Sequence, residues 1–482
     1  MKRIMILALE CSTTSAKALL YDPRCGEIVR AKSESYPNEV SAFKGVWGAQ
    51  DTPAVIALTV RLGRDLVSET DNTDTIEAIA LGGTFHSILV CDSAMRPVTP
   101  TYTWMYTGAE DLTGRLRKNE RYTLDYYHRT GCMVHALYPA FQLMKLREEG
   151  FNFDGKRIAS QSGFLFYTLT GLHLETACTN SGGGLINLSQ RDWDRETLDD
   201  IGLSQENVAT LINYHDAKPL SPAGAALLGL KSGIPVLPSY PDGALNQVGS
   251  GALGWGIMTF SMGTSAALRL SVPAPLVPER PSTWCYLSPD AWMSGAAVSG
   301  ACNCVDWIKP VLFPTKSYAE VESVGVDYRK MPYFLPFLFG ERCPGWDDGK
   351  KGGFFGMRSY HTPLDMYYSV LEGILFNVYQ CYEVLCEIDQ KPQRIQLSGG
   401  ILNSARWKQM CADIFNREMS CEKIPNASLV GGTVLALQYT GHLDNIKNYH
   451  VKSGDIVRPD EKGVSLFAAR YQNYLSYYSA TR

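Results

Sequence analysis

Two short turns that are rich in small hydroxyl residues could bind a phosphate group. The segment LALECSTTSAKALLYD contains Thr14-Ser15-Ala16, and TFSMGTSAALRLSV contains Thr264-Ser265-Ala266, 250 positions later. Strand-like apolar residues flank both copies, so each turn would present successive backbone N–H groups and hydroxyls to an anion. One such turn alone is more often a plain β-hairpin. The recurrence of the turn at the start of each half of the chain favours a phosphate site.

Two acidic residues near these turns could supply the metal ligand and the proton acceptor that phosphoryl transfer requires. Glu10 ends the first apolar run, and Asp242 lies in SYPDGALNQVG, just before the second turn. A carboxylate can accept a proton from a hydroxyl group, and its oxygens can bind Mg²⁺. An Asp that follows Pro is commonly a turn residue. The position of Asp242 at the junction of the two halves, in a glycine-rich stretch, favours a functional role instead.

The elements that must position these groups alternate between strand and helix. Apolar runs over 4–9, 75–83 and 394–400 predict strands, and helical periodicity covers 52–68 and 364–387. This alternation predicts the α/β class. Together with the repeated turn, it predicts two similar lobes.

Shorter signals fill in the second half of the chain and the region after residue 83. SILVCD, from Ser87, predicts another strand, WKQMCADIF predicts a helix that starts near Trp407, and LVGGTVLALQYTG predicts a closing helix with Gly441 as its C-cap. The chain contains no GxxxxGK[ST] and no GxGxxG after the first strand. A nucleotide site would therefore have to use the two repeated turns.

Composition limits the classes of function. The 482 residues are 45% hydrophobic and 20% charged with a net charge of −4, which is typical of a globular protein and gives no basic field for nucleic acid. The 13 cysteines form no CxxC pair, which favours reduced thiols rather than a disulfide framework. The first apolar run, Ile4 to Leu9, is too short for a signal peptide or a membrane span. We expect a cytoplasmic protein with no membrane or nucleic-acid partner.

Several long motifs resemble the FGGY type of sugar kinase, in the family's order and over nearly the whole chain. GGFFGMRSYHTPLDMYYSVLEG, from Gly352 to Gly373, fits the second family signature, and FLFGERCPGWD resembles the GERxPxWD segment before it. LSGGILNSARWKQMCAD resembles the adenosine segment, SLVGGTVLA resembles the closing helix, and PDGALNQVGSG resembles the segment with the catalytic Asp.

The resemblance implies two actin-like ATPase (ribonuclease H-like) lobes that flank a deep cleft, with a sugar-binding lobe over 1–245 and an ATP-binding lobe over 246–482. It implies ATP and Mg²⁺ as cofactors, a sugar or sugar-acid substrate phosphorylated at a terminal hydroxyl, and Asp242 as the general base. A homodimer is a further expectation. The implied phosphate and ATP residues are Thr13, Thr14, Ser15, Lys17, Gly263, Thr264, Ser265, Gly399, Gly400, Asn403, Gly431 and Gly432. The implied sugar-binding residues are Thr84, Phe85, His86, Trp104, Tyr106, Asp242 and Gly243, and the implied metal ligands are Glu10 and Asp242.

Details of these motifs point to different substrates. TFHSILV, with His86, and DGALNQVG resemble gluconate kinases. The family's sugar-contacting WxDxR, however, is WMYTG here, so Tyr106 replaces an Asp and Gly108 replaces an Arg that could pair with a carboxylate. This loss favours a neutral ketose or polyol over an aldonate. In the first turn, Glu10 stands where the family has Asp, and Ser12 where it has Gly.

Two other functions remain open at this point. An actin- or Hsp70-like ATPase that acts through partner binding would share the nucleotide elements. A degenerate kinase homologue that binds a sugar without turnover would fit the changed Glu10 and the lost WxDxR. Asp242 and the Gly352–Gly373 signature favour the sugar kinase.

Overall fold

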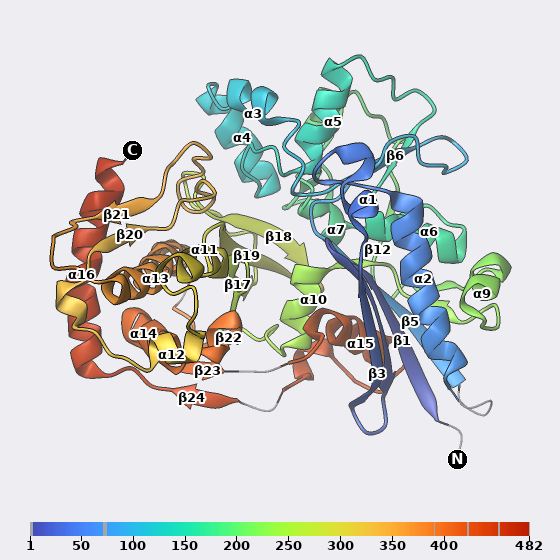
Figure 1. Cartoon of the computed structure of the whole chain (residues 1–482). Helices are drawn as coiled ribbons and strands as arrows, with labels where there is room; N and C mark the ends of the chain where they lie inside the picture. The colour runs from blue at the N-terminus through green and yellow to red at the C-terminus, as the bar shows by residue number, and fades with distance from the viewer. Residues whose placement is uncertain (1–2, 71–74, 390, 422–423, 452–453, 482) are drawn as a thin grey trace.

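Two seven-stranded mixed sheets form the centres of two lobes, shown side by side in Figure 1. The computed structural model describes residues 3–70, 75–389, 391–421, 424–451 and 454–481. The α/β class and the two-lobe organisation predicted from the sequence are confirmed. None of the helices in the described ranges combines the length and apolar character that a bilayer crossing needs.

The sheet of the first lobe is built around β1, which is buried from Met5 to Cys11. β1 is antiparallel to β2 on one side and parallel to β5 on the other. The strand order is β13-β14-β5-β1-β2-β3, and β15 also pairs with β5. A strand covered on both faces reads as a continuous apolar run, as the sequence of β1 does. The strands are β1 (Ile4–Cys11), β2 (Ser15–Asp22), β3 (Glu27–Ser35), β5 (Thr75–Gly83), β13 (Lys218–Pro219), β14 (Pro235–Val236) and β15 (Tyr240–Pro241).

The sheet of the second lobe repeats this central arrangement. β16 is antiparallel to β17 and parallel to β22, just as β1 is to β2 and β5, and the order is β18-β19-β17-β16-β22-β23-β24. The strands are β16 (Ile257–Met262), β17 (Ala266–Val272), β18 (Trp284–Ser288), β19 (Ala291–Val298), β22 (Arg394–Gly399), β23 (Met419–Cys421) and β24 (Asp455–Val457).

Helices cover both sheets. α2 packs on β1 and β2, and α6 packs on β5; α13 packs on β17 and β19 of the second lobe. α13 begins where predicted because Thr362 and Asp365 form a capping box around Pro363. The covering helices are α2 (Thr52–Ser68), α6 (Gln161–Thr170), α9 (Pro222–Leu228), α11 (Cys302–Leu312), α13 (Pro363–Ile388), α14 (Ala405–Phe415) and α16 (Glu461–Ala480).

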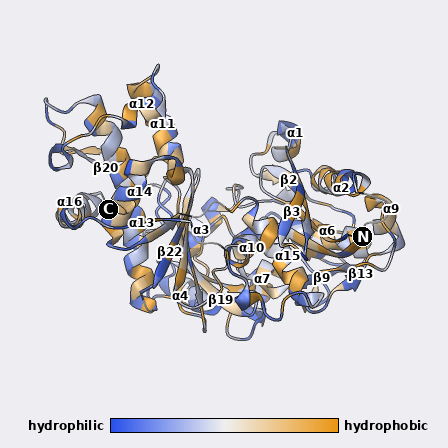
Figure 2. Cartoon of the chain, turned by 90° about the horizontal axis from the view of Figure 1, so that it is seen from below, coloured by the Kyte–Doolittle hydropathy of each residue, from blue (hydrophilic) through white to orange (hydrophobic). Residues whose placement is uncertain are grey.

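Two helices lie between the lobes in both views of the chain (Figures 1 and 2), α10 (Asp242–Gly249) and α15 (Ala427–Tyr439). The two helices approach closely at Gly431. A Cβ at this position would lie 1.9 Å from the backbone oxygen of Leu245, so only glycine fits there. The predicted lobe boundary after residue 245 falls inside α10. α15 also packs on β1 and β5, so a helix from the second half of the chain covers the sheet of the first.

The remaining elements are short, and most of them lie between β5 and α10 in the chain. They are α1 (Asn38–Ser41), β4 (Ala49–Gln50), β6 (Leu89–Cys91), β7 (Thr101–Tyr102), α3 (Glu110–Leu116), α4 (Glu120–Thr130), α5 (Pro139–Glu148), β8 (Arg157–Ala159), β9 (Leu174–Thr176), α7 (Ala177–Ser181), β10 (Ile186–Asn187), β11 (Asp192–Trp193), α8 (Arg195–Ile201), β12 (Thr210–Ile212), α12 (Tyr318–Glu322), β20 (Tyr333–Leu335), β21 (Gly353–Phe355) and the 3₁₀ turns η1 (Phe43–Gly45), η2 (Tyr328–Lys330), η3 (Gly400–Asn403) and η4 (Ile446–Asn448).

The sequence predicted several of the long elements and missed others, above all α16. α2, β5, α14 and β22 lie within one or two residues of the predicted ranges. The strand predicted from Ser87 is confined to β6. α15 ends with Thr440 as its cap, and Gly441 follows with φ of +78°. The helix predicted to close the core, α15, is not the last helix of the chain. α16 follows it and packs on α13 and α14.

Candidate active site

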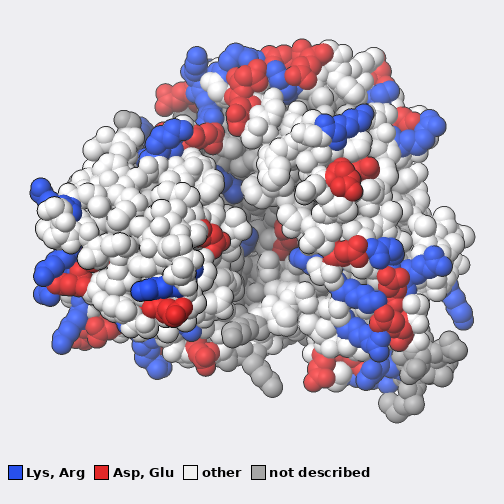
Figure 3. Space-filling view, in the orientation of Figure 1, with Lys and Arg blue, Asp and Glu red and all other residues white. Residues whose placement is uncertain are grey.

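The ends of three strands of the first sheet bring the predicted acidic groups together. Glu10 and Cys11 of β1 pair with Gly82 and Gly83 of β5, and β15 pairs with the same two glycines from the other side. Asp242 follows β15 directly, at the first position of α10. Because parallel strands end at the same edge of a sheet, Glu10 and Asp242 approach each other there. Figure 3 shows the groove between the lobes, with acidic and basic side chains visible inside it.

Asp242 has one oxygen held and one oxygen without a protein partner. Its Oδ1 accepts hydrogen bonds from the backbone N–H of Gly243 at 2.7 Å and of Phe85 at 3.4 Å. Within the described chain, Oδ2 has no hydrogen-bond donor. Burial raises the pKa of the Asp242 carboxyl, and the nearby charge of Glu10 raises it further, whereas Arg269 acts in the opposite direction. A fixed carboxylate with a raised pKa is suited to accept a proton.

Glu10 is completely buried and is also only half satisfied. Its Oε1 accepts from Lys17 Nζ at 2.7 Å and from Ser12 Oγ at 2.5 Å, while Oε2 is buried with no hydrogen-bond partner in the described structure. A buried, unpaired carboxylate oxygen beside a second carboxylate fits a divalent cation. No three His, Cys, Asp or Glu side chains of the described residues cluster as metal ligands. Mg²⁺ at a phosphate site needs only one or two carboxylates, because phosphates and water supply the rest.

The first turn is closely tied to its surroundings. Ser12 N donates to Ser15 O at 3.0 Å, and Gln50 Nε2 donates to Thr13 O at 2.5 Å. Thr13 Oγ1 lies 3.3 Å from Thr84 Oγ1 and accepts from Trp104 Nε1 at 3.1 Å. Thr13, Thr84 and Trp104, which the sequence assigned to phosphate and sugar separately, are therefore brought together.

The second turn is open. Gly263, Thr264 and Ser265 are all exposed, and the turn is closed by a hydrogen bond from Gly263 N to Ser265 O at 2.9 Å. The hydroxyls of Thr264 and Ser265 have no partner among the residues that the structure describes. They are available to an oxyanion in the cleft.

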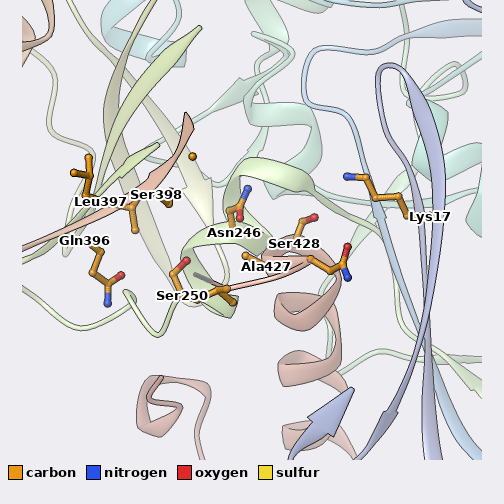
Figure 4. Close-up of a pocket in the computed structure, with 12 residues that line it drawn as sticks. Lys17, Asn246, Ser250, Gln396, Leu397, Ser398, Ala427 and Ser428 are labelled. Atoms are coloured by element: carbon orange, nitrogen blue, oxygen red, sulfur yellow. The ribbon is translucent and has the colours of Figure 1, made fainter. Parts of the chain in front are cut away.

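A cavity of about 320 Å³ lies between the lobes (Figure 4). Lys17 lines it from the first lobe, Asn246 and Ser250 from α10, Gln396 to Gly399 from β22, and Asn426 to Ser428 from the start of α15. Its polar lining suits a nucleotide better than an apolar ligand.

The predicted ATP residues divide into two groups around this cavity. Lys17 and Gly399 line it, and Gly400 and Asn403 lie in η3, directly after Gly399. Gly431 and Gly432 are buried instead against α10 and Ala80. A contribution from these two glycines is thus indirect, through the placement of the start of α15. The sequence missed the cavity-lining residues Asn246, Ser250, Thr259, Gln396, Leu397, Ser398, Ile424, Asn426, Ala427 and Ser428.

His86 belongs to an aromatic cluster close to Asp242, formed by Phe85, His86, Tyr138 and Tyr286. It has φ of +58°, and its Nδ1 contacts the backbone oxygen of Gly182. Burial lowers the pKa of His86 to about 3, so the ring is neutral. Because a carbonyl can only accept, Nδ1 carries the proton and Nε2 remains an acceptor. Tyr138 and Tyr286 meet the ring edge-on, with centroids at 5.3 and 5.6 Å, and their hydroxyls lie 2.9 Å apart.

The segment that replaces WxDxR lies differently from the rest of the predicted sugar site. The ring of Tyr106 packs against Tyr102 with centroids 4.5 Å apart and a tilt of 33°, and it lies over Gly108, where a Cβ would be 2.3 Å from it. Burial raises the pKa of Tyr106, and the charge of Glu149, beyond the end of α5, raises it further. No contact in the described structure joins Tyr106 to Asp242 or His86. The structure thus brings together the other predicted sugar-side residues (Thr84, Phe85, His86, Trp104, Asp242 and Gly243) but not Tyr106.

Two arginines of the second lobe reach this region, and the sequence assigned a role to neither. Arg269, on β17, donates to Ser261 Oγ at 3.0 Å and approaches Gly243 so closely that a Cβ there would lie 3.3 Å from its Nε. Arg342 lies in the loop between β20 and β21 that carries GERCPGW. That motif was visible in the sequence, but only the folded chain places its arginine.

Known proteins resemble the chain over its whole length. Residues 5–249 and 258–438 match the N- and C-terminal domain models of the FGGY family of carbohydrate kinases. A gluconokinase of Bacillus subtilis is 27% identical over 91% of this chain and 88% of its own, and a xylulose kinase of Escherichia coli is 25% identical over 86% of each.

Solved structures agree with this result. A gluconate kinase from Lactobacillus acidophilus superposes with a TM-score of 0.94 at 24% identity, covering 99% of this chain and 98% of its own. The structure of Plasmodium falciparum glycerol kinase with ADP superposes with a TM-score of 0.86 at 16% identity, with the same coverage. Matching domain models on both lobes, around a cleft that holds paired carboxylates and two hydroxyl turns, establish that the chain belongs to the FGGY family of carbohydrate kinases, which are ATP-dependent phosphotransferases.

Proposed function

We propose that this protein transfers the γ-phosphoryl group of ATP to a terminal hydroxyl of a small sugar or sugar derivative, with Asp242 as the general base. The observation that carries the proposal is the environment of Asp242. Two backbone N–H groups hold Oδ1, whereas Oδ2 accepts no hydrogen bond within the described structure and remains available to a substrate hydroxyl. Burial and the charge of Glu10 raise the pKa of this carboxyl, which makes it a better proton acceptor.

The polar cavity supports a place for ATP. Its lining by Lys17, α10, β22 and α15 would hold the nucleotide against the second lobe, with the phosphates directed toward the open turn at Gly263–Ser265. There the backbone N–H groups and hydroxyls of Thr264 and Ser265 would stabilise charge on the transferred group. Glu10 Oε2 and Asp242 are the groups that would hold Mg²⁺, which supplies positive charge to the phosphates when bound.

The aromatic cluster supports a place for the sugar beside Asp242. The Nε2 atom of neutral His86 can accept a hydrogen bond from a sugar hydroxyl. The ring of Phe85, which packs against Tyr286 with centroids 5.3 Å apart, fixes the backbone beside Asp242 and His86. A sugar held here would present one end to Asp242, which is the geometry that phosphorylation of a terminal hydroxyl requires.

A second candidate function rests on the salt bridge at Glu10. Lys17 and Ser12 already occupy one oxygen of this carboxylate. If Lys17 and Ser12 keep the Glu10 carboxylate from binding a metal ion, the protein would bind sugar and nucleotide without turnover. An ATPase that acts through partner binding is the third candidate, and it would hydrolyse ATP without a sugar.

One experiment separates these candidates. ADP release is measured with a panel of ketoses, alditols and aldonates, and the product is identified as a phosphomonoester by ³¹P NMR. The parent protein should release ADP only with an acceptor sugar. Asp242→Asn should lower kcat by about 10²–10⁴-fold with sugar affinity kept within a few-fold, and the exposed Asp125→Asn serves as the matched control. Parental turnover by Asp242→Asn would exclude Asp242 as the base, and sugar-independent ADP release would favour the ATPase.

A further inference from the structure

Two arginines of the second lobe, Arg269 and Arg342, lie near the predicted sugar-side residues. Arg269 adjoins Gly243, where a Cβ would lie 3.3 Å from Arg269 Nε. Burial lowers the pKa of Arg269, the charge of Asp242 raises it, and the charge of Arg342 lowers it again. Arg269 is therefore close to both Asp242 and Arg342.

The loop that carries Arg342 adjoins the aromatic cluster, because the ring of Trp346 lies 6.5 Å from that of Tyr138. Burial is the main cause of the lowered pKa of His86, and the charge of Arg342 acts in the same direction. Burial also raises the pKa values of Tyr138 and Tyr286, and the charge of Arg342 acts against this increase. The charge of Arg342 thus acts on three rings of the cluster.

The charge of Arg342 has no acidic partner within the described chain. Its Nε is buried and makes no hydrogen bond. The acidic residues of the same loop are engaged elsewhere: Glu341 pairs with Lys350 at 3.1 Å, and Asp348 pairs with His135 at 2.9 Å and with Arg117 at 3.3 Å.

A neighbouring donor in the same loop is also unpaired. The indole Nε1 of Trp346 is buried with no hydrogen-bond partner in the described structure, and its ring lies 6.5 Å from that of Tyr138. Buried donors of this kind are costly unless an acceptor completes them. The loop between β20 and β21 therefore brings a cation and unpaired N–H groups to the aromatic cluster.

We propose that Arg342, with Arg269 beside it, binds a carboxylate at the end of the substrate remote from the reacting hydroxyl, so that the substrate is a sugar acid. The inference rests on the proposed function and names its substrate class. A planar guanidinium can donate two parallel hydrogen bonds to a carboxylate, which a neutral ketose cannot accept in the same way. The loss of the family's Arg at Gly108 predicted a neutral substrate. The structure offers another cation, Arg342, which comes from the second lobe.

Matched pairs of probes test this assignment. ADP release is measured with D-gluconate against D-glucitol and with D-xylonate against xylitol, each pair equal in carbon number. The parent should prefer each aldonate by about tenfold or more in kcat/KM. Arg342→Gln should raise the KM for the aldonates about tenfold or more, with kcat within about threefold. Its KM for the alditols should stay unchanged, and Arg342→Lys should recover part of the aldonate preference.

Two further measurements keep the test decisive. Arg121→Gln, at a 92% exposed arginine, is the matched control, and thermal unfolding of each variant verifies folding. A thermal shift of the parent by gluconate without ATP, lost in Arg342→Gln, would support the carboxylate site even if no probe were phosphorylated, in which case only the proposed function fails. Preference of the parent for the alditols, or an equal loss by Arg342→Gln on aldonates and alditols, would overturn the inference.

Discussion

The two hairpins that open the lobes share a topology but differ in charge and exposure. In the first, Glu10 and Lys17 face each other across β1 and β2, and the carboxylate of Glu10 is completely buried. The second hairpin carries its charge, Arg269, further along β17, opposite Thr259, and its turn at Gly263–Ser265 is exposed and free of charged residues.

The surroundings of the two turns reinforce this difference. The first turn is held by side chains of Gln50, Thr84 and Trp104. The second is held by backbone alone, with Gly263 O accepting from Cys302 N at 3.0 Å. A fixed, charged turn can orient a metal and a base, whereas an open, neutral turn can donate to a phosphate without adding charge. The repeated sequence thus supports a division of labour rather than two equivalent phosphate sites.

The largest expected effect concerns the glycine that ends the neighbouring parallel strand in each lobe. Gly399→Ala would place a Cβ 2.2 Å from Met262 O at φ of +92°, so it should cost about 2–5 kcal/mol of unfolding free energy. Gly83→Ala meets the Ser162 side chain at 2.5 Å at an ordinary φ, and it should cost about 1–3 kcal/mol. Urea denaturation measures both variants. Equal costs would remove this structural difference between the hairpins.

The next effect concerns the charge in the first hairpin. Glu10→Ala should raise the Mg²⁺ concentration needed for half-maximal activity by roughly tenfold, with the KM for the sugar changed far less. The reason is the loss of the unpaired Oε2 beside Asp242. Glu69→Ala, which removes an exposed carboxylate paired with Arg30 and Lys32, is the control. An unaltered Mg²⁺ dependence would show that Glu10 serves Lys17 alone.

A smaller effect concerns the hydroxyls. Thr264→Val should raise the KM for ATP about 2–10-fold, because one hydrogen bond to phosphate is lost. Thr13→Val should instead raise the KM for the sugar, because the oxygen of Thr13 accepts from Trp104 Nε1. Titrations of ATP and sugar on both variants compare the turns directly. If both variants change only the KM for ATP, the turns are equivalent and the division of labour is wrong.

The sequence predicted the elements whose signals are local. The buried β1 is a continuous apolar run, and α13 carries its capping box in the chain itself. α16 was missed because its buried face includes Arg470, which pairs with Glu372 on α13, 98 positions away in the chain. Such a pair makes the helix look polar in sequence, and only tertiary packing satisfies it.

The site was predictable to the same extent. Asp242, Glu10 and the two turns lie in local motifs that end strands, so their positions follow from the sheet. Arg269 and Arg342 come from a strand interior and a loop, and nothing near them in sequence indicates that they meet at Gly243 and His86. Tyr106 is the opposite case. Its place in the sequence motif predicted a sugar contact, but in the structure its ring lies against Tyr102.

The most direct test of the charged half of this comparison is the pH dependence of kcat/KM at Mg²⁺ concentrations well below saturation, where most of the enzyme holds no metal at Asp242 and Glu10. Because Asp242 must be ionised to accept a proton and its pKa is raised, activity should fall with decreasing pH at a value above about 3.9, the ordinary value for Asp. Glu10→Gln removes a negative charge that raises this pKa, so the acid limb should move to lower pH. Arg269→Gln removes a positive charge that lowers it, so the limb should move to higher pH, and Thr264→Val should leave it in place. An acid limb at or below the ordinary value in the parent, or one that Glu10→Gln does not move, would contradict the account.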